Sequence, residues 1–409
     1  MSHDISAEAP ARSLATSSAE PTGARSTVVG GAIGHFIEWF DWTIYGLLSG
    51  VFARQMFPTD DPYAALIAVY GTFAAGFLAR PVGSFILSPL ADRYGRRNML
   101  SLTIVLAGVG SLLIAVTPPF ATVGLLAPLL LLAARLIQGF STGGEYQIAA
   151  AFLNEHARPD RRAFAASSQM VATGQSILCA MGVASLTTKL FAEPALSSWG
   201  WRIPFLLGAA LSIYGLYLRS GLPETPSFEK ARQRERLSLR SIVAGLIEFP
   251  RESFIVVIIQ ASGVQFYLWM VFLPTYANLT SGLPLSSGLL AGMITLGVYC
   301  VIVSPLAALS DRIGRKPLLI AAAAGFLLLT YPMLQALKTA DFTTFLIINL
   351  IGVFFIALNN AVIGTVFCEL FPTRVRASGI GLPYAICVAI FGGTSPLIAT
   401  YFLKNGQDY

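Results

Sequence analysis

Three ionisable side chains stand close together in the first long apolar stretch of this 409-residue chain: His35, Glu38 and Asp41. If the stretch is a helix, their spacing of three residues places them on neighbouring parts of one face. A carboxyl in a low-dielectric environment binds a proton more readily than one in water, and histidine titrates near neutral pH. We therefore predict that Glu38 or Asp41 carries a proton, with His35 as a third candidate. A structural ion pair for either acid, and hydrogen-bonded packing for His35, are the alternatives.

Two arginines, Arg80 and Arg135, also lie inside apolar stretches. A charge at the bilayer centre costs at least about 2.5–3.5 kcal/mol, so such a residue normally has a partner or faces a cavity. Arginine stays charged and grips a carboxylate with two hydrogen bonds. We expect Arg135, helped by Arg80, to bind an anionic substrate, with a structural pair to Glu38, Asp41 or Glu145 as the alternative. Further candidates for this binding set are Gln138, Tyr45, Gln265 and Asn359. In the second half of the chain Tyr267, Trp269 and Asn360 could also line the cavity, and ordinary helix packing is the alternative for each of these second-half residues.

The stretches that hold these residues are long enough to cross a membrane. The chain is 55% hydrophobic and only 12% charged, with a mean hydropathy of +0.68. A soluble domain carries about 25% charged residues, so the composition argues against a soluble enzyme, a disordered protein and a nucleic-acid-binding protein. A helix needs about 20 apolar residues to span the hydrocarbon core. Eleven apolar runs approach or exceed this length: 28–51, 63–90, 99–116, 123–152, 164–186, 203–218, 254–277, 286–309, 318–337, 342–370 and 378–403.

The basic residues predict how the runs are oriented. Of the 27 Lys and Arg side chains, twenty fall in the N-terminal tail or in alternate loops, and five fall in the remaining loops. The last two are the intramembrane arginines. Basic loops stay in the cytoplasm, so we expect a multi-pass protein of the cell inner membrane with a cytoplasmic N-terminus.

Two charged motifs occur twice along the chain. Asp92-Arg93-Tyr94-Gly95-Arg96-Arg97 follows the second run, and Asp311-Arg312-Ile313-Gly314-Arg315-Lys316 follows the eighth, 219 residues later. A second motif, 155–162, returns 214 residues later at 369–376. Repeated halves around a central site are a transporter plan. We expect a polar cytoplasmic tail at 1–27, a six-helix bundle at 28–220, a cytoplasmic linker at 221–251 and a C-terminal bundle with five visible spans at 252–409.

The repeated turns are predicted to form a cytoplasmic gate. Gly95 and Gly314 permit the positive φ of a tight turn. Acids and bases around them can pair in one conformation and separate in another, whereas a solvated turn that only fixes topology is the alternative. The candidate gate residues are Asp92, Arg93, Gly95, Arg96, Glu145, Glu155, Arg162, Asp311, Arg312, Gly314, Arg315, Glu369 and Arg374.

The repeated turn resembles the signature loop of the major facilitator superfamily, and further motifs are similar to its metabolite:proton symporter family. In the first run, Gly34-His35-Phe36-Ile37-Glu38-Trp39-Phe40-Asp41-Trp42 resembles the family pattern Gly-Asn-x-x-Glu-Trp-Phe-Asp-Phe. Segments 80–83, 135–145 and 199–205 also follow the family pattern, and the match covers 28–403. Two features depart from it: eleven spans are visible where the family normally has twelve, and His35 stands where the family often has Asn.

This resemblance implies an all-α fold of two pseudo-symmetric helical bundles. It also implies proton-coupled uptake of a small organic acid, such as citrate, 2-oxoglutarate or shikimate, by alternating access. The expected partners are the organic acid, protons and the lipid bilayer, with no nucleic acid, and the chain is expected to act as a monomer. A proline or betaine transporter and a non-transporting membrane sensor stay open as alternatives. The sequence contains no recognisable P-loop, metal-ligand spacing or cofactor fingerprint, so we expect no enzyme activity, no metal and no cofactor.

Overall fold

The computed structural model describes residues 24–59, 62–229 and 248–392, and the regular secondary structure of these residues is entirely helical. The first group of helices is α1 (Ala24–Met56), α2 (Pro62–Tyr94), α3 (Arg96–Val116), α4 (Phe120–Val123), α5 (Leu126–His156), α6 (Arg162–Leu190), α7 (Ala195–Ser198) and α8 (Ile203–Ser220). The second group is α11 (Pro250–Ala261), α12 (Val264–Tyr267), α13 (Leu273–Ser281), α14 (Leu285–Ile313), α15 (Lys316–Leu337), α16 (Phe342–Leu370) and α17 (Arg376–Cys387). Short 3-10 turns lie at Pro159–Arg161, Gly200–Arg202 and Thr373–Val375, and π-helical turns at Leu268–Phe272 and Val388–Gly392.

The predicted membrane runs all fall on helices, although the last one lies within the described residues only as far as 392. In the described part of the chain, nine helices are long and apolar enough to cross a membrane. The other two runs differ for physical reasons. The first forms α1, which is 33 residues long and carries the ionisable side chains of His35, Glu38 and Asp41. The seventh is divided into α11, α12, a π turn and α13, each too short to span alone.

The seventh run turns at Ser262 and Gly263, between α11 and α12. The amide of Gly263 donates to the carbonyl of Gln260 at 2.8 Å, and the amide of Ser262 to that of Ile258 at 3.4 Å. Irregular backbone at membrane depth is tolerated where it lines a cavity. Gln260 and Gly263 do line a cavity, so this helix is interrupted at a cavity wall.

Helices α2 and α5 approach each other so closely that side chains are excluded between them. A Cβ atom on Gly139 would collide with the backbone of Gly76, and one on Gly143 would collide with the carbonyl of Arg80. Small residues allow such close packing of membrane helices. The contact fixes where α2 lies against α5 and therefore where the side chain of Arg80 begins.

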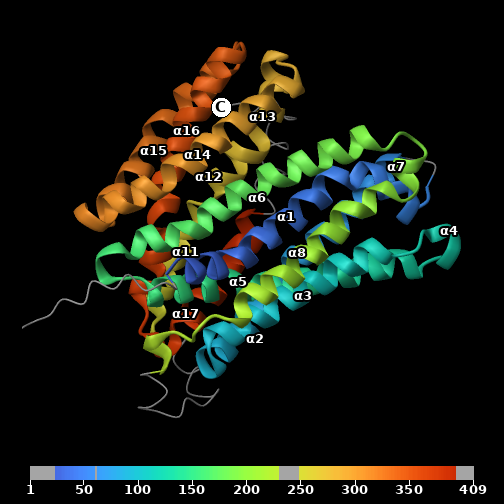
Figure 1. Cartoon of the computed structure of the whole chain (residues 1–409). Helices are drawn as coiled ribbons and strands as arrows, with labels where there is room; N and C mark the ends of the chain where they lie inside the picture. Colours follow the sequence, from blue (N-terminus) through green and yellow to red (C-terminus); the bar gives the residue numbers. More distant parts are fainter. Residues whose placement is uncertain (1–23, 60–61, 230–247, 393–409) are drawn as a thin grey trace, which may run out of the picture.

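Helices α1–α8 form one group, here called the N-half, and α11–α17 a second group, the C-half. Figure 1 shows that the halves meet where α17 lies beside α2 and α5, and that they diverge toward the ends carrying α7 and α13. We call the end where they meet the closed end.

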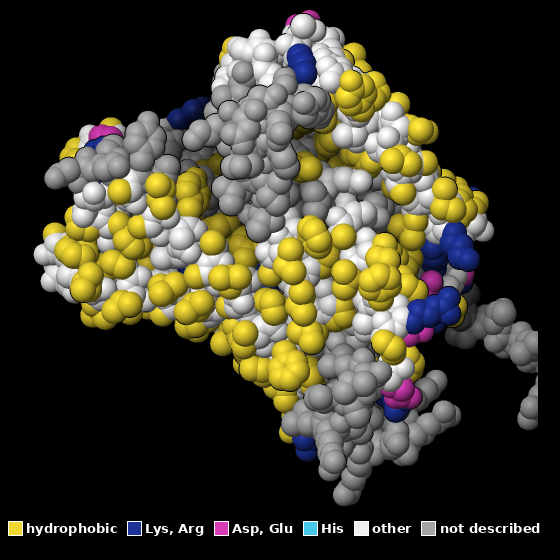
Figure 2. All heavy atoms as spheres, turned by 180° about the vertical axis from the view of Figure 1, so that it is seen from behind, with side chains coloured by type: hydrophobic (Ala, Val, Ile, Leu, Met, Phe, Trp, Pro, Cys, Tyr) yellow, Lys and Arg dark blue, Asp and Glu magenta, His cyan; other side chains and the backbone are white. Residues whose placement is uncertain are grey.

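The outside of the molecule is apolar in a way that fits a lipid environment. Figure 2 shows hydrophobic side chains over the middle of one face, with most charged side chains near its edges. Leu327 and Ile213 are 83% and 72% exposed. Large apolar patches open to the surroundings mark membrane contact, so this protein spans a membrane several times.

Candidate functional site

Two adjoining cavities lie between the halves. The first, of about 320 Å³, is lined from α1, α2, α5 and the α17 region, and the second, of about 520 Å³, draws most of its wall from the C-half; both volumes include space open to solvent. Side chains common to both are His35, Trp39, Tyr146 and Tyr384. The shared wall makes the two cavities parts of one site.

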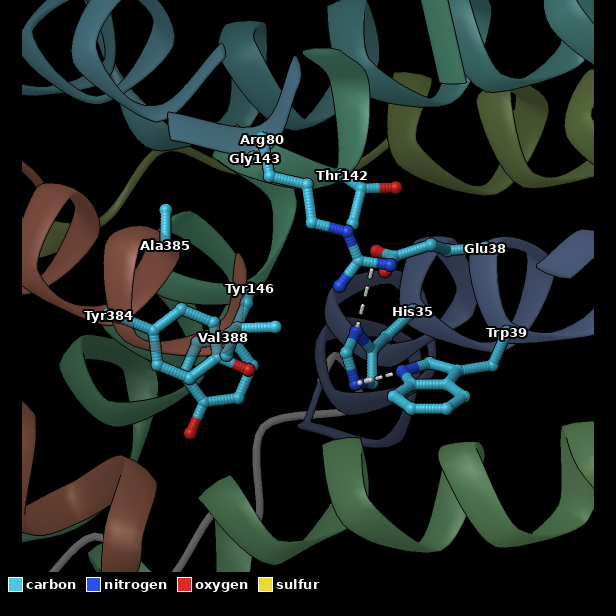
Figure 3. Close-up of a pocket in the computed structure, with 10 residues that line it drawn as sticks. All are labelled: His35, Glu38, Trp39, Arg80, Thr142, Gly143, Tyr146, Tyr384, Ala385 and Val388. Carbon is cyan, nitrogen blue, oxygen red and sulfur yellow. Dashed lines mark hydrogen bonds and ion pairs between the residues drawn. The ribbon is translucent and has the colours of Figure 1, made fainter. Parts of the chain in front are cut away.

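Helix α1 supplies the titratable groups of the first cavity. Oε2 of Glu38 lies 3.7 Å from Nδ1 of His35, and the indole of Trp39 donates a hydrogen bond of 3.1 Å to Nε2 of His35. Because Nε2 accepts this bond, a neutral His35 carries its proton on Nδ1, which faces Glu38. An imidazole and a carboxyl thus lie side by side on the cavity wall (Figure 3).

Arg80, from α2, is the cation of the first cavity. Its guanidinium carbon lies 4.1 Å from the ring centre of Phe77 and 4.5 Å from that of Trp42. Among the described residues no carboxylate forms an ion pair with it, and its Nε has no hydrogen-bond partner. Burial of an unpaired charge is unfavourable, so an anion entering this cavity would be attracted to Arg80. Figure 3 shows Arg80 and Glu38 directed into the same space.

Asp41 lies one turn further along α1, in the interior of the N-half, and is only 2% exposed. The hydroxyl of Ser111 donates to Oδ2 of Asp41. The amide of Gln138 donates to the same oxygen at 3.4 Å and to Ser111 at 3.1 Å. Arg135 donates to Oε1 of Gln138 at 2.6 Å. We call these four residues the Asp41 centre; its arginine reaches the carboxylate through the Gln138 amide.

Aromatic rings enclose the guanidinium of Arg135. Its carbon lies 4.0 Å from the ring centre of Trp42, 4.2 Å from that of Tyr45 and 5.0 Å from that of Phe73. The residue is fully buried, and its Nε and one terminal nitrogen have no hydrogen-bond partner among the described residues. Cation–π attraction is strongest where water is excluded, and here it replaces direct carboxylate contact.

The structure separates the residues that the sequence predicts to bind substrate. Arg80 lines the first cavity, whereas the other members of the set line neither cavity: Arg135, Gln138, Tyr45, Gln265 and Asn359. Of the two adjacent asparagines that the sequence offers, Asn360 lines the second cavity, and it donates to the hydroxyl of Tyr299 at 2.9 Å. Successive residues of a helix point about 100° apart, so only packing decides which of two adjacent asparagines faces the cavity.

The sequence gives no sign of one contact that crosses between the halves. Tyr146 of α5 and Tyr384 of α17 stack with ring centres 4.1 Å apart and planes 4° apart. Both rings line both cavities. In the sequence each tyrosine resembles an ordinary core aromatic residue, because its stacking partner lies in the other half of the chain.

At the closed end, Asp92 joins the end of α2 to the start of α17. Its carboxylate accepts hydrogen bonds from the backbone amides of Ala377 and Ser378, at 3.3 and 2.9 Å, and from the hydroxyl of Ser378 at 2.6 Å. A negative charge is stabilised at a helix N-terminus. The signature acid of the N-half therefore binds the first turn of a C-half helix.

Arg96 and Glu155 extend this contact. Arg96 pairs with Asp92 at 2.9 Å and donates to the carbonyl of Thr373 at 2.8 Å. Glu155 pairs with Arg376 at 2.7 Å and with Arg96 at 3.4 Å. We call Asp92, Arg96 and Glu155 the N-half latch.

The second copy of the motif makes the reciprocal contact. Asp311, at the end of α14, accepts hydrogen bonds of 3.0 Å from the amides of Ala163 and Phe164 in the first turn of α6. Arg315 pairs with Asp311 at 2.8 Å and with Glu369 at 3.3 Å. We call Asp311, Arg315 and Glu369 the C-half latch. Each motif turns at a glycine: Gly95, between α2 and α3, has a φ of 105°, and Gly314, between α14 and α15, has a φ of 92°. Both values confirm the positive φ that the sequence predicts.

The remaining gate candidates lie apart from these contacts. Glu145 pairs with Arg219 of α8 at 2.5 Å and accepts a hydrogen bond from Thr103, so its described contacts lie within the N-half rather than across the gate. The sequence could not pair it with Arg219, which lies 74 residues further along the chain, in α8. The others are placed as follows: Arg93 lies over the ring of Tyr94, Arg312 is exposed at the end of α14, Arg374 pairs with Glu248 at 2.8 Å, and Arg162 begins α6 with its Nε unpartnered in the described structure.

Comparison with known proteins places this architecture in a family. A family model described as Major Facilitator Superfamily matches residues 31–396. A citrate-proton symporter of Salmonella typhi is 35% identical over 378 residues, covering 92% of this chain and 86% of the relative. A glycine betaine/proline/ectoine/pipecolic acid transporter of Dickeya dadantii is 31% identical over 406 residues, covering 94% and 78%.

Among solved structures, a proton:xylose symporter bound to a bromo-deoxyglucose has the same fold, with a TM-score of 0.75 and 18% sequence identity. The superposition covers 94% of this chain and 89% of the other. The likeness supports the helical arrangement described above, and at this identity it concerns the fold alone.

Proposed function

This chain belongs to the major facilitator superfamily, and from that premise we propose that it takes up a small organic acid together with protons. It is a membrane transporter and not an enzyme. The observation that carries the proposal is Arg80, a buried guanidinium on the cavity wall without a carboxylate partner in the described structure. A carboxylate of the substrate would supply the missing charge and accept two hydrogen bonds from the guanidinium.

The two halves would contact different parts of the substrate. The N-half wall holds Arg80, Glu38 and His35, whereas the described C-half wall offers uncharged groups such as Gln260 and Asn360. A small acid would place its carboxylate toward Arg80 and its hydroxyl or carbonyl groups toward these neutral partners. A few placed polar groups in a mostly apolar pocket fix the orientation of a ligand.

The orientation follows from the basic loops. We place the N-terminus and the closed end in the cytoplasm, because most lysines and arginines lie in the tail and in the loops at that end. The described conformation is then closed to the cytoplasm by the two latches and the Tyr146–Tyr384 stack. Uptake requires these contacts to open while the opposite ends of the halves approach each other.

Proton coupling is assigned to Glu38 or Asp41. Glu38 faces the cavity beside His35, and Asp41 lies in the interior with only an indirect link to Arg135. Replacing the coupling acid by its amide, as Glu38→Gln or Asp41→Asn, should abolish accumulation against a gradient and leave exchange intact. An amide variant that still accumulates substrate uphill would remove that acid from the coupling role.

The test of substrate class is uptake into proteoliposomes under an imposed inward proton gradient. Labelled citrate, 2-oxoglutarate, shikimate, proline and betaine form the panel. We expect one of the acids to accumulate, a protonophore to collapse the accumulation, and Arg80→Gln to lose exchange as well. Arg54→Gln is the matched control, because Arg54 lies on the exposed surface of α1. Accumulation of betaine or proline alone would replace the acid, and accumulation of nothing would favour a sensor.

A second candidate, an osmolyte with both a carboxylate and an ammonium group, has one observation in its favour. Trp39, Tyr146 and Phe266 line the second cavity, and Glu38 lies on the adjoining wall. Aromatic faces and a carboxylate together bind quaternary ammonium groups. The relative from Dickeya dadantii is named for such solutes, and the same uptake panel distinguishes the two candidates.

A further inference from the structure

Trp42 lies between the substrate cavity and the Asp41 centre. Its ring centre is 4.5 Å from the guanidinium carbon of Arg80, which faces the cavity, and 4.0 Å from that of Arg135, which belongs to the centre. Two like charges are thus in contact with one indole. The residue that precedes it in α1 is Asp41 itself.

The indole is held in place from several sides. Its Nε1 donates to the hydroxyl of Thr142 at 3.3 Å, and Thr142 lines the first cavity. The rings of Phe73 and Phe77 meet it edge to face, with centres 4.9 and 4.6 Å away. Trp42 is 5% exposed. A side chain fixed in this way keeps both guanidinium groups at defined positions.

We propose that Trp42 is a positioning residue that couples occupation of the cavity at Arg80 to protonation of the Asp41 centre. The inference rests on the proposed function, since it needs an anionic substrate and a proton. It adds a role for a residue that touches neither the proton nor, in the described cavity lining, the substrate.

The coupling follows from charge. With the cavity empty, Arg135 favours the ionised form of Asp41, to which it is linked through the amide of Gln138. Arg80 lies against the same indole as Arg135. A substrate carboxylate at Arg80 brings a negative charge next to this indole, which adjoins Asp41 in α1. A nearby like charge disfavours a second ionised carboxylate, so Asp41 then takes up a proton more readily. By linkage, a protonated Asp41 favours substrate binding by the same factor. The indole keeps Arg135 on its aromatic face and away from direct contact with Asp41, which would hold the acid ionised whether or not substrate is bound.

The groups packed around Asp41 leave few other sources for this effect. Helix α5 contributes Arg135, which reaches Asp41 through Gln138 and carries the ring of Tyr45 on its guanidinium. Arg80 of α2 and Glu38 and His35 of α1 line the adjoining cavity. Helices α3 and α8 face the carboxylate with Ser111 and Gly208, which do not titrate. Of these charged groups, Arg135 is the one joined to Asp41 by hydrogen bonds, and Trp42 holds it against the same ring as Arg80.

The test uses Trp42→Leu and Trp42→Phe in proteoliposomes, with whichever acid of the panel the wild type accumulates. Three quantities are measured: exchange, proton-driven accumulation, and the ratio of substrate affinity at acidic to that at alkaline external pH. Coupling between two sites typically changes affinity by about 5–150-fold. We expect Trp42→Leu to reduce that ratio to within about twofold and to lose accumulation while exchange continues. Trp42→Phe, which keeps an aromatic face, should retain most of the ratio.

Trp201→Leu is the matched control. Trp201 is also a buried N-half tryptophan with a hydrogen bond, to Gln55 at 3.0 Å, and a guanidinium, that of Arg202, at 4.3 Å from its ring centre. Its loss should leave the ratio of accumulation to exchange unchanged. Should Trp42→Leu fail to fold, Trp42→Met fills the site without an aromatic face and carries the same prediction.

The possible outcomes distinguish failure of the coupling role from failure of the proposed function. Equal loss of exchange and accumulation in Trp42→Leu, or an unchanged pH ratio, would overturn the coupling role and leave Trp42 as a packing residue. If Asp41→Asn keeps uphill accumulation while Glu38→Gln loses it, the inference fails and the proposed function stands. If the wild type accumulates no acid of the panel, both fail together.

Discussion

The two latches carry the same sequence motif but lie in different environments. In the N-half latch the side chains of Asp92 and Arg96 are fully buried, and that of Glu155 is 1% exposed. In the C-half latch Arg315 is 17% exposed and Glu369 is 40% exposed. Each signature acid binds the first turn of a helix in the opposite half. The reciprocal contacts are thus symmetric in topology and unequal in burial.

The start of the linker accounts for much of this difference. The carboxylate of Glu224 accepts a hydrogen bond of 3.0 Å from the amide of Arg96, and the hydroxyl of Thr225 donates to Glu155 at 2.5 Å. The ring centre of Phe228 lies 5.5 Å from the guanidinium carbon of Arg96, and Phe228 is 3% exposed. These residues shield the N-half latch from water, so breaking a charge pair there is costly, whereas an exposed pair contributes about 0–1 kcal/mol.

The sharpest test of this comparison is Asp92→Asn. The change removes the charge from three hydrogen bonds to α17 and breaks the shorter of the two ion pairs that Arg96 makes in the described structure. We therefore expect the closed end to lose about 3 kcal/mol. That corresponds to an open population about 100-fold larger. The measurement is the rate at which a maleimide labels Cys368 in nanodiscs, with Cys179, Cys300 and Cys387 replaced by serine. Cys368 is buried at the junction of the halves, among Tyr146, Ala150 and Phe371.

Asp160→Asn is the control for this experiment. Asp160 lies at the same end of the molecule and pairs with Arg158, but both side chains are more than half exposed. The same chemical change there should leave the labelling rate of Cys368 unaltered. A labelling rate for Asp92→Asn equal to that of Asp160→Asn would show that the buried latch does not hold the halves together.

Asp311→Asn tests the other side of the comparison. In the described structure Asp311 accepts hydrogen bonds from two backbone amides and from none of the hydroxyl groups, and its partner Arg315 is partly exposed. We expect a loss of about 1.4 kcal/mol, or about a tenfold faster labelling of Cys368. An effect as large as that of Asp92→Asn would mean that burial by the linker does not set the strength of a latch.

The sequence could predict the parts of this structure that depend on local pattern. Long apolar runs predicted the membrane helices, and the repeated motif predicted two related turns with glycine at positive φ. The sequence could not predict the burial of the N-half latch. Thr225 and Phe228 look like ordinary linker residues, and only the fold places them over Glu155 and Arg96.

The site shows the same limit. Spacing placed Glu38 and Asp41 on neighbouring parts of one helix, yet one lines the cavity and the other is enclosed by α3, α5 and α8. Arg80 and Arg135 differ in the same way: Arg80 faces the cavity and Arg135 does not, although both lie against Trp42 of another helix. A pattern along one helix identifies polar residues, but the neighbouring helices decide which of them meet a ligand.

The smallest expected effect is that of Glu369→Gln. Glu369 has one described ion pair, to Arg315 at 3.3 Å, and water reaches its side chain. Its contribution should be at most about 0.5 kcal/mol, so Cys368 should be labelled no more than about twofold faster, and this difference should vanish at high salt because exposed charges are screened. Glu155→Gln, at the matching position of the buried latch, should keep its larger effect at the same salt concentration. A salt-insensitive effect at Glu369 would mean that the C-half latch is shielded from water in the working transporter, and the two latches would then be equal in energy as well as in topology.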